Sequence, residues 1–214
     1  MTHMHTELVF VLDKSGSMAG LEKDTIGGYN SILEKQRVGE GTVTITTVLF
    51  DNGIELLHDR LPVESVELLS AEDYVVGGMT ALFDAVGFAI HKIDKVQKSV
   101  KPSMQADKVL FVITTDGMEN SSHKFNTKEI KLLISARKEL GWEFLFLGAN
   151  IDVVEVATSI GISAEHAVEY IGDEMGTQQN FEVLNETVSS VRRGHEIHED
   201  WKGKIENDVR KRRK

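Results

Sequence analysis

The sequence has 214 residues, of which 41% are hydrophobic, so it holds enough apolar side chains for one sizeable core and is neither disordered nor fibrous. It contains no cysteine, which excludes disulfides, thiolate zinc sites and a cysteine nucleophile. Its apolar runs are too short for a membrane span or for the core of a signal peptide, and we therefore expect a cytoplasmic protein that binds no membrane.

The net charge of −10 is distributed unevenly along the chain. Residues 201–214 carry seven lysines and arginines against two acidic residues, which leaves a net charge of −15 on residues 1–200. Nucleic-acid binding needs clustered cations over a broad face, so we expect no nucleic-acid partner. For the basic end of the chain (KRRK) we favour a frayed, solvated terminus over a contact with an acidic partner or with nucleic acid.

The first part of the chain predicts a buried strand, a helix and a hairpin. Residues 8–12 (LVFVL) form a continuous apolar run, which is typical of a strand covered on both faces. Residues 21–36 favour a helix, although the glycine pair at 27–28 weakens that prediction. Residues 42–61 read as a hairpin, in which Asn-Gly within the Asp-Asn-Gly turn at 51–53 supplies the residues with positive φ.

The rest of the chain alternates between helical periodicity and apolar strand-like runs. In chain order, we predict a helix from residue 81 to about 93, a strand at 109–113, a helix at 130–140 closed by the glycine at 141, a strand at 142–147, a helix at 153–160 and a last helix at 181–191. This alternation predicts a three-layer, doubly wound α/β fold, with a mostly parallel sheet, one antiparallel edge strand and helices on both faces. We expect one domain over residues 1–195, followed by a charged tail at 196–214.

Polar side chains follow two of the predicted strands at the point where each strand ends. Asp13, Ser15 and Ser17 come after the run at 8–12, and Asp116 comes after the run at 109–113. The carboxyl ends of parallel strands meet at one edge of a sheet, so the two carboxylates face one cleft if these strands are neighbours. Two carboxylates that lie close together repel each other, and a positive charge normally sits between them.

Thr80 lies in a third loop, GGMTAL, just before the predicted helix at 81. A threonine at this position is usually an N-cap, but together with the other two loops we read its hydroxyl as a ligand. The complete set consists of hard oxygen donors: Asp13, Ser15, Ser17, Thr80 and Asp116. Such donors suit Mg²⁺, Mn²⁺ or Ca²⁺ better than zinc or copper. Because three of them are neutral hydroxyls, a bound ion would still attract one further anionic oxygen.

Three sequence segments, VLDKSGSM, GGMTALFDA and ITTDGMEN, resemble in order and placement the three loops of a von Willebrand factor A (vWA) domain. The metal-ion-dependent adhesion site (MIDAS) of that family has the pattern Asp-x-Ser-x-Ser, then Thr, then Asp. It maps onto Asp13, Ser15, Ser17, Thr80 and Asp116. The resemblance spans roughly residues 5–195. It implies a Mg²⁺ or Mn²⁺ ion contacted by the serines and the threonine, with the aspartates often acting through water.

The resemblance also implies a function. In such domains a Glu or Asp of a partner protein commonly completes the coordination of the ion. We therefore expect a divalent-metal-dependent protein-binding module rather than an enzyme, of the stand-alone intracellular type found in microbes. The last helix shifts in some members of the family when the metal site changes state, and whether the helix at 181–191 does so here is left open.

Three polar residues near the motif have alternative roles. We expect Lys14 to point to solvent, although it is also placed to modulate anion affinity. Asp84 lies in the first turn of a predicted helix, where a negative charge suits the helix dipole, or it acts behind the metal ligands. Asn120 either shapes the rim of the site or caps its own turn.

The strongest alternative from another class is a Mg²⁺-dependent phosphohydrolase of the haloacid dehalogenase type, with Asp13 as its nucleophile. Such enzymes usually carry a second Asp two residues later as general acid, and here that position is Ser15. A serine hydrolase is disfavoured because no activating base is evident. His195 and His198 are one residue short of the His-Glu-x-x-His zinc spacing, and we expect both at the surface.

Overall fold

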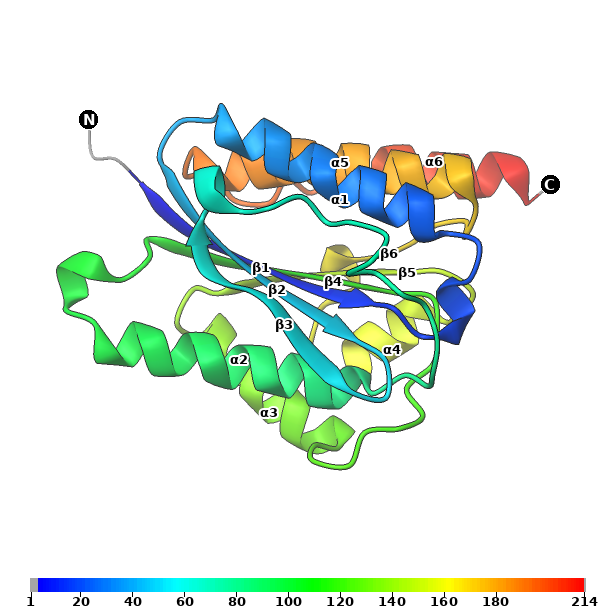
Figure 1. The fold of residues 1–214 in the computed structure, drawn as a ribbon, viewed down its shortest axis with the longest axis horizontal. Coiled ribbons are helices and arrows are strands. Elements are labelled where there is room, and N and C mark those ends of the chain that lie inside the picture. The colour runs from blue at the N-terminus through cyan, green and yellow to red at the C-terminus, as the bar shows by residue number, and fades with distance from the viewer. Residues whose placement is uncertain (1–3, 214) are drawn as a thin grey trace.

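The computed structural model describes residues 4–213 and confirms the mostly parallel sheet with an antiparallel edge strand. The strand order in the sheet is β3-β2-β1-β4-β5-β6, and β2 and β3 form the antiparallel pair (Figure 1). The strands are β1 (His5–Asp13), β2 (Thr42–Phe50), β3 (Ile54–Pro62), β4 (Lys108–Thr115), β5 (Glu143–Gly148) and β6 (Ala167–Glu169). The first strand lies at the centre, between β2 and β4, and is parallel to both.

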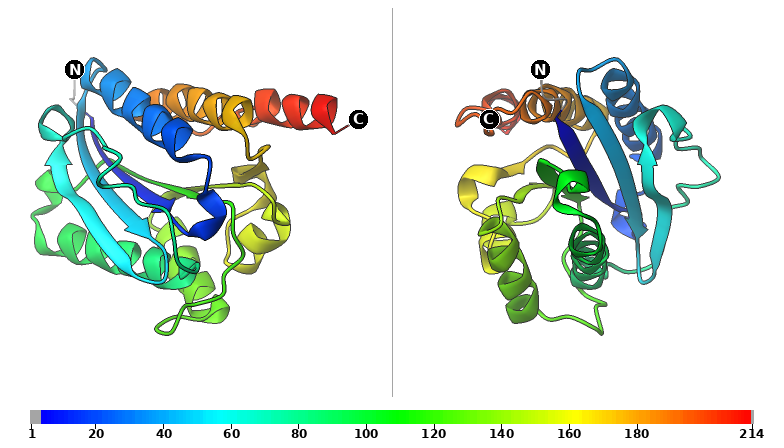
Figure 2. Two further views of the ribbon diagram at one scale, coloured as in Figure 1. Left: turned by 45° about the vertical axis from the view of Figure 1, so that its right-hand side comes forward. Right: turned by 90° about the vertical axis from the view of Figure 1, so that its left-hand side faces the viewer.

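Helices cover both faces of the sheet, as Figure 1 and Figure 2 show. One face carries α1 (Glu22–Arg37), α5 (Glu174–Arg192) and α6 (Gly203–Arg212), and the other carries α2 (Leu82–Ser99), α3 (Thr127–Lys138) and α4 (Val153–Ser159). Alternate side chains of β1 enter different cores, because successive residues of a strand point to opposite faces. Phe10 packs in the core beneath α1 and α5, whereas Val9 and Val11 pack in the core beneath α2 and α3.

The hairpin between β2 and β3 turns without left-handed residues. Neither Asn52 nor Gly53 has a positive φ, so the expected conformation of this turn is wrong. The side chain of Asp51 instead accepts a hydrogen bond from the backbone N–H of Gly53 at 2.6 Å, and Asp51 N–H donates to the Gly53 carbonyl at 3.2 Å. An Asp side chain that bonds the backbone two residues later imitates a turn and removes the need for positive φ.

The last long helix and the last strand differ most from the predicted elements. The last long helix, α5, begins at Glu174 rather than near residue 181, because its polar first turns carry no apolar periodicity and are capped by the side chain of Asp173. The sequence did not reveal the edge strand β6, which has three residues and is too short for a periodicity to register.

One glycine of the pair in α1, Gly28, has a packing reason. A Cβ at Gly28 would lie 2.1 Å from Cδ2 of Phe181 on α5, so a side chain there would exclude the phenyl ring. The low helix propensity at this position is therefore offset by the close approach of α1 and α5.

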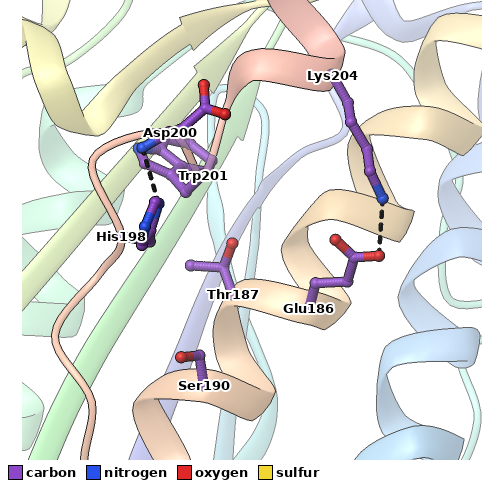
Figure 3. A pocket seen from close by; sticks show the side chains of 7 residues that line it. All are labelled: Glu186, Thr187, Ser190, His198, Asp200, Trp201 and Lys204. Atoms are coloured by element: carbon purple, nitrogen blue, oxygen red, sulfur yellow. Dashed lines mark hydrogen bonds and ion pairs between the residues drawn. The ribbon is translucent and has the colours of Figure 1, made fainter.

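The basic end of the chain is folded against the domain: α6 extends to Arg212, so the expectation of a frayed terminus is wrong for Lys211 and Arg212. Trp201 and Ile205 are buried in the core beneath α1 and α5, and Trp201 Nε1 donates to the carbonyl of Glu165 at 2.8 Å. Figure 3 shows Lys204 of α6 beside Glu186 of α5, with 2.8 Å between the charged atoms. Apolar burial, which the charge run concealed, holds this segment.

Two further expectations concern the surface. His195 and His198 are exposed, as predicted. Within residues 4–213, no helix combines the length and the apolar character that crossing a bilayer requires.

The burial of Trp201 predicts a measurable contribution of the C-terminal segment to stability. Trp201→Ala should lower the free energy of unfolding by about 3 kcal/mol, because it removes a large buried side chain and leaves a cavity. Leu132→Ala is the matched control, since Leu132 is 63% exposed and its truncation should cost less than about 0.5 kcal/mol. Urea titration followed by circular dichroism measures both values. Equal stabilities of the two variants would contradict the packing described here.

Candidate metal centre

The first loop of the candidate site turns directly after the central strand. Asp13 is the last residue of β1 and is fully buried, and its Oδ1 accepts a hydrogen bond from Ser15 N–H at 2.7 Å. Ser15 precedes the short 3₁₀ turn η1 (Gly16–Met18), which contains Ser17. The hydroxyl oxygens of Ser15 and Ser17 lie 3.1 Å apart, so the alternate spacing brings both to one side of the turn.

The other two loops meet the first around Gly117. A methyl group placed on Gly117 would lie 2.8 Å from Ser17 Oγ, 2.9 Å from Thr80 Oγ1 and 3.6 Å from Ser15 Oγ. The neighbouring Asp116 lies near enough to the Ser17 side chain for the hydroxyl to oppose the rise of its pKa. The structure thus brings hydroxyls from two loops to one small space beside a carboxylate of the third.

Backbone hydrogen bonds tie the loop before Thr80 to the loop after Asp13. Gly16 N–H donates to the Gly78 carbonyl at 3.1 Å, and Gly77 N–H donates to the Lys14 carbonyl at 2.9 Å. Gly78 has a φ of +74°, which a glycine adopts without strain. These bonds explain why the paired glycines stand before Thr80: the loop approaches the first loop through its main chain.

The N-cap interpretation of Thr80 is wrong. The N-cap position of α2 is Ala81, and no side chain of that residue caps the helix. Glu119 takes this role from a distant loop, because its Oε2 accepts a hydrogen bond from Phe83 N–H at 2.9 Å. The Thr80 hydroxyl is therefore not used by the helix, and it faces the space beside Gly117.

The two carboxylates are held in an environment that disfavours negative charge. Burial raises the pKa of Asp13, against the opposing effect of hydrogen bonds from Thr115 and Ser15, and the charge of Asp116 raises it further. Burial also raises the pKa of Asp116, although hydrogen bonds from Ser17 and Asn150 oppose this. Within the described residues, Asp116 Oδ1 is buried and has no hydrogen-bond partner. A cation at this point would stabilise the negative charges of Asp13 and Asp116, and it would give Asp116 Oδ1 a partner.

The three neighbouring polar residues have different outcomes. Lys14 does not point to solvent, because its ammonium pairs with Glu55 on β3 at 2.6 Å and its side chain is 14% exposed. Asn120 holds the main chain of Thr80 through two hydrogen bonds: its Oδ1 accepts from Thr80 N–H at 2.8 Å, and its own N–H donates to the Thr80 carbonyl at 3.0 Å. It therefore positions Thr80.

Asp84 holds the loop that follows the Asp116 segment. Its carboxylate accepts hydrogen bonds from the backbone N–H groups of His123, Lys124 and Phe125, each at 2.9 Å. Burial would raise the pKa of Asp84, but these three bonds outweigh burial and hold the pKa below its ordinary value. Asp84 lies in the first turn of α2, as expected, and its charge is used by the loop.

Sequence reasoning missed three residues that support the site. Thr115 Oγ1 donates to Asp13 Oδ2 at 2.5 Å, and the hydroxyl of the buried Tyr74 donates to the main-chain carbonyl of Asp13. Asn150, whose side chain opposes the rise in the pKa of Asp116, has a φ of +56°, a conformation that asparagine tolerates better than most residues. Thr115 could have been found from its place beside Asp116 at a strand end, whereas Tyr74 and Asn150 carry no local signal.

The donor set fits a hard divalent cation. Within residues 4–213, no group of three or more His, Cys, Asp and Glu side chains is arranged to hold a metal, so any metal here must depend on hydroxyl oxygens. Two carboxylates and three hydroxyls are the oxygen ligands that magnesium, manganese or calcium accept. A cavity of about 960 Å³, lined by Ser17 and Asp116 among others, opens beside them and gives access from solvent.

Comparison with known proteins supports the fold. No family model and no curated protein sequence matches this chain. Among solved structures, proximal thread matrix protein 1 from the mussel byssus superposes with a TM-score of 0.59 at 15% identity, over 87% of this chain and 46% of that one. A von Willebrand factor type A protein from Catenulispora acidiphila gives 0.59 at 14% identity, over 87% of this chain and 43% of that one. The chain has the vWA fold.

Two further matches qualify this result. The vWF domain of the type V pili tip protein Mfa5 from Porphyromonas gingivalis gives a TM-score of 0.61 at 9% identity, over 92% of this chain and 99% of that one. Another structure of the mussel protein has a zinc-occupied MIDAS motif. This chain spans less than half the length of the mussel and Catenulispora proteins, and at these identities the likeness establishes the vWA architecture alone.

The burial of Asp13 predicts opposite effects of one substitution with and without a divalent ion. Burial raises the pKa of Asp13 in the folded chain, so its carboxyl group ionises at a lower pH in the unfolded chain than in the folded one. As the pH rises above the ordinary carboxyl pKa, Asp13 therefore lowers the free energy of unfolding. At pH 7 in EDTA, Asp13→Asn should therefore melt at a higher temperature than the parent protein.

Magnesium should reverse that order. At 100 times its dissociation constant, Mg²⁺ should add about 2.7 kcal/mol to the free energy of unfolding of the parent and almost nothing to that of the variant. Thermal unfolding with Mg²⁺ and with EDTA measures both. A variant that is less stable than the parent in EDTA, or equally stabilised by Mg²⁺, would contradict this assignment.

Gly117→Ala tests the space between the hydroxyls without removing any ligand or charge. The added methyl should block the position next to Ser17 and Thr80 and abolish the rise in melting temperature that Mg²⁺ causes. Gly27→Ala is the control, because a Cβ there meets nothing within 4 Å and only improves helix propensity. Retention of the full Mg²⁺ effect in Gly117→Ala would show that the ion does not bind between these hydroxyls.

Proposed function

We propose that this chain is a protein-binding module that depends on a divalent cation. Asp13, Ser15, Ser17, Thr80 and Asp116 would hold the ion, and an acidic side chain of a partner protein would complete its coordination. The observation that carries the proposal is the convergence of three hydroxyls around Gly117, beside a buried carboxylate oxygen that lacks a partner within the described residues.

The balance of charge in the ligand set favours binding of an external anion. When bound, the ion supplies a double positive charge next to a solvent-accessible cavity. Asp13 and Asp116 offer two negative charges, and that of Asp13 is shared with hydrogen bonds from Ser15 and Thr115. Hydroxyl ligands add no charge, so the attraction for a carboxylate from outside is retained. The zinc-occupied MIDAS motif of the mussel protein is consistent with such a site.

The supporting residues keep the ligands in place before any ion arrives. Thr115 orients the Asp13 carboxylate, and Asn120 fixes the main chain of Thr80 through two hydrogen bonds. Glu119 and Asp84 hold the loop after Asp116 by accepting hydrogen bonds from backbone N–H groups. A preorganised set of ligands loses less entropy on binding than a flexible one.

The geometry gives no support to the phosphohydrolase alternative. A nucleophilic carboxylate must present an oxygen to the phosphorus atom, but Asp13 is fully buried and both of its oxygens accept hydrogen bonds. Ser15, at the position of the general acid, lies 3.1 Å from Ser17 through its hydroxyl. A hydroxyl does not protonate a leaving group comparably to a carboxylic acid near neutral pH.

Affinity capture with the immobilised chain tests the proposal. Partner proteins should be retained from a cell extract in Mg²⁺ and released by EDTA, and Thr80→Ala should retain at most about a tenth as much. Thr158→Ala is the matched control, because Thr158 is an exposed threonine on α4, and it should behave like the parent. Retention that is equal in Mg²⁺ and EDTA would refute the proposal. Magnesium-dependent hydrolysis of an aryl phosphate that is lost in Asp13→Asn would favour the enzyme instead.

A further inference from the structure

The cavity beside the candidate metal site has an acidic rim, which we define as Glu22, Asp24 and Glu174. These residues lie in the first turns of α1 and α5, which flank the opening of the 960 Å³ cavity. Asp173 also lines the cavity, but its charge is balanced by Arg212 of α6. Among the described lining residues, Lys23 is the one Lys or Arg.

A second cavity continues from this rim along the surface between α1 and α5. It has a volume of about 520 Å³ and shares Lys23, Asp24 and Glu174 with the first cavity. Gly27 and Gly28 also line it, and the absence of a side chain at Gly27 leaves that part of α1 open. The metal site and the groove between the helices therefore meet at Asp24 and Glu174.

Two of the residues that line these cavities are buried and have a side-chain oxygen without a hydrogen-bond partner. Asp116, which is 4% exposed, lines the first, and Asn185, which is 2% exposed, lines the second. Within residues 4–213, neither Asp116 Oδ1 nor Asn185 Oδ1 has a hydrogen-bond partner. Buried polar groups of folded proteins are almost always paired, so the oxygen of Asp116 remains available to the ion of the proposed function, and that of Asn185 to a polar group bound in the groove.

The stabilisation of helix ends explains only part of the acidic rim. Acidic residues in a first turn favour the helix dipole, and Glu22 additionally accepts a hydrogen bond from Gly20 N–H at 2.8 Å. In the described part of the chain, the carboxylates of Asp24 and Glu174 take part in no hydrogen bond or ion pair. Their charges also repel the acidic side chain that the proposed function brings to the neighbouring ion. A partner with a matching cation would remove this conflict.

We propose that the partner segment which supplies the metal-binding carboxylate also carries a lysine or arginine within a few residues of it, and that this cation binds between Asp24 and Glu174, where the two cavities meet. The inference rests on the proposed function and specifies the chemistry of its partner. The acidic rim then repels partner segments that carry only acidic residues, whereas the metal ion without this rim would bind them as well.

Titration of the ¹⁵N-labelled chain with blocked seven-residue peptides tests this inference. Three peptides have a central Glu flanked on both sides by Lys, by Gln or by Glu, and a fourth has a central Gln flanked by Lys. In Mg²⁺ at low ionic strength, the Lys-flanked Glu peptide should bind about fivefold more tightly than the Gln-flanked one, and the Glu-flanked one most weakly. The advantage of lysine should shrink at 0.5 M salt, because the charges are then screened.

Paired variants assign the effect to the acidic rim. Asp24→Asn combined with Glu174→Gln should abolish the advantage of the Lys-flanked peptide while preserving its dependence on Mg²⁺. Glu139→Gln combined with Glu196→Gln is the control, since these acids follow α3 and α5 and do not line either cavity, and it should keep the fivefold preference.

The outcomes separate this inference from the proposed function. Equal affinities of the Lys-flanked and Gln-flanked Glu peptides, both dependent on Mg²⁺, would overturn the inference and leave the proposed function intact. Binding of the Lys-flanked Gln peptide as tightly as its Glu counterpart, or no Mg²⁺-dependent binding by any peptide, would overturn the proposed function and this inference with it.

Discussion

A carboxylate without solvent exposure lowers the stability of a fold whenever it is charged, and Asp13 has this position at the end of the central strand. Hydrogen bonds from Ser15 N–H and from the Thr115 hydroxyl offset part of that cost. The second carboxylate, Asp116, adds to it through repulsion. The loops above the sheet therefore enclose two carboxylates whose burial and mutual repulsion a positive charge would offset. The neutral hydroxyls supply additional oxygens without adding repulsion.

The acidic residues around this point divide into two groups by what their oxygens contact. Asp84 and Glu119 accept several hydrogen bonds from backbone N–H groups, and these bonds hold the loop after Asp116 in place. Asp116 keeps an oxygen to which no described residue donates a hydrogen bond. Acidic side chains a few residues apart in sequence thus serve different purposes, and the distinction follows from the backbone geometry around each.

The central features of the fold and of the candidate site were predictable because their signals are local. Continuous apolar runs identify β1 and β4, and the rule that ligands meet the carboxyl ends of parallel strands brings Asp13 and Asp116 together. The errors concern contacts between distant residues. Lys14 finds Glu55 across 41 positions of sequence, and Trp201 is buried against a segment that precedes it by more than thirty residues. Neither partner could be chosen without the three-dimensional arrangement.

Both borders of the sheet are closed to further strands. At one border, β3 carries irregularities in its pairing with β2, and Arg60 adopts a φ of +49° while its Nε donates to the buried Glu7 at 2.8 Å. At the other, the three-residue β6 is flanked by α6, and Arg213 forms two hydrogen bonds of 2.7 Å with Glu169. Bulges, short strands and edge charges are the devices by which proteins resist edge-to-edge aggregation. The sheet is therefore unsuited to growth by strand addition, and association with other molecules has to proceed through side chains and loops.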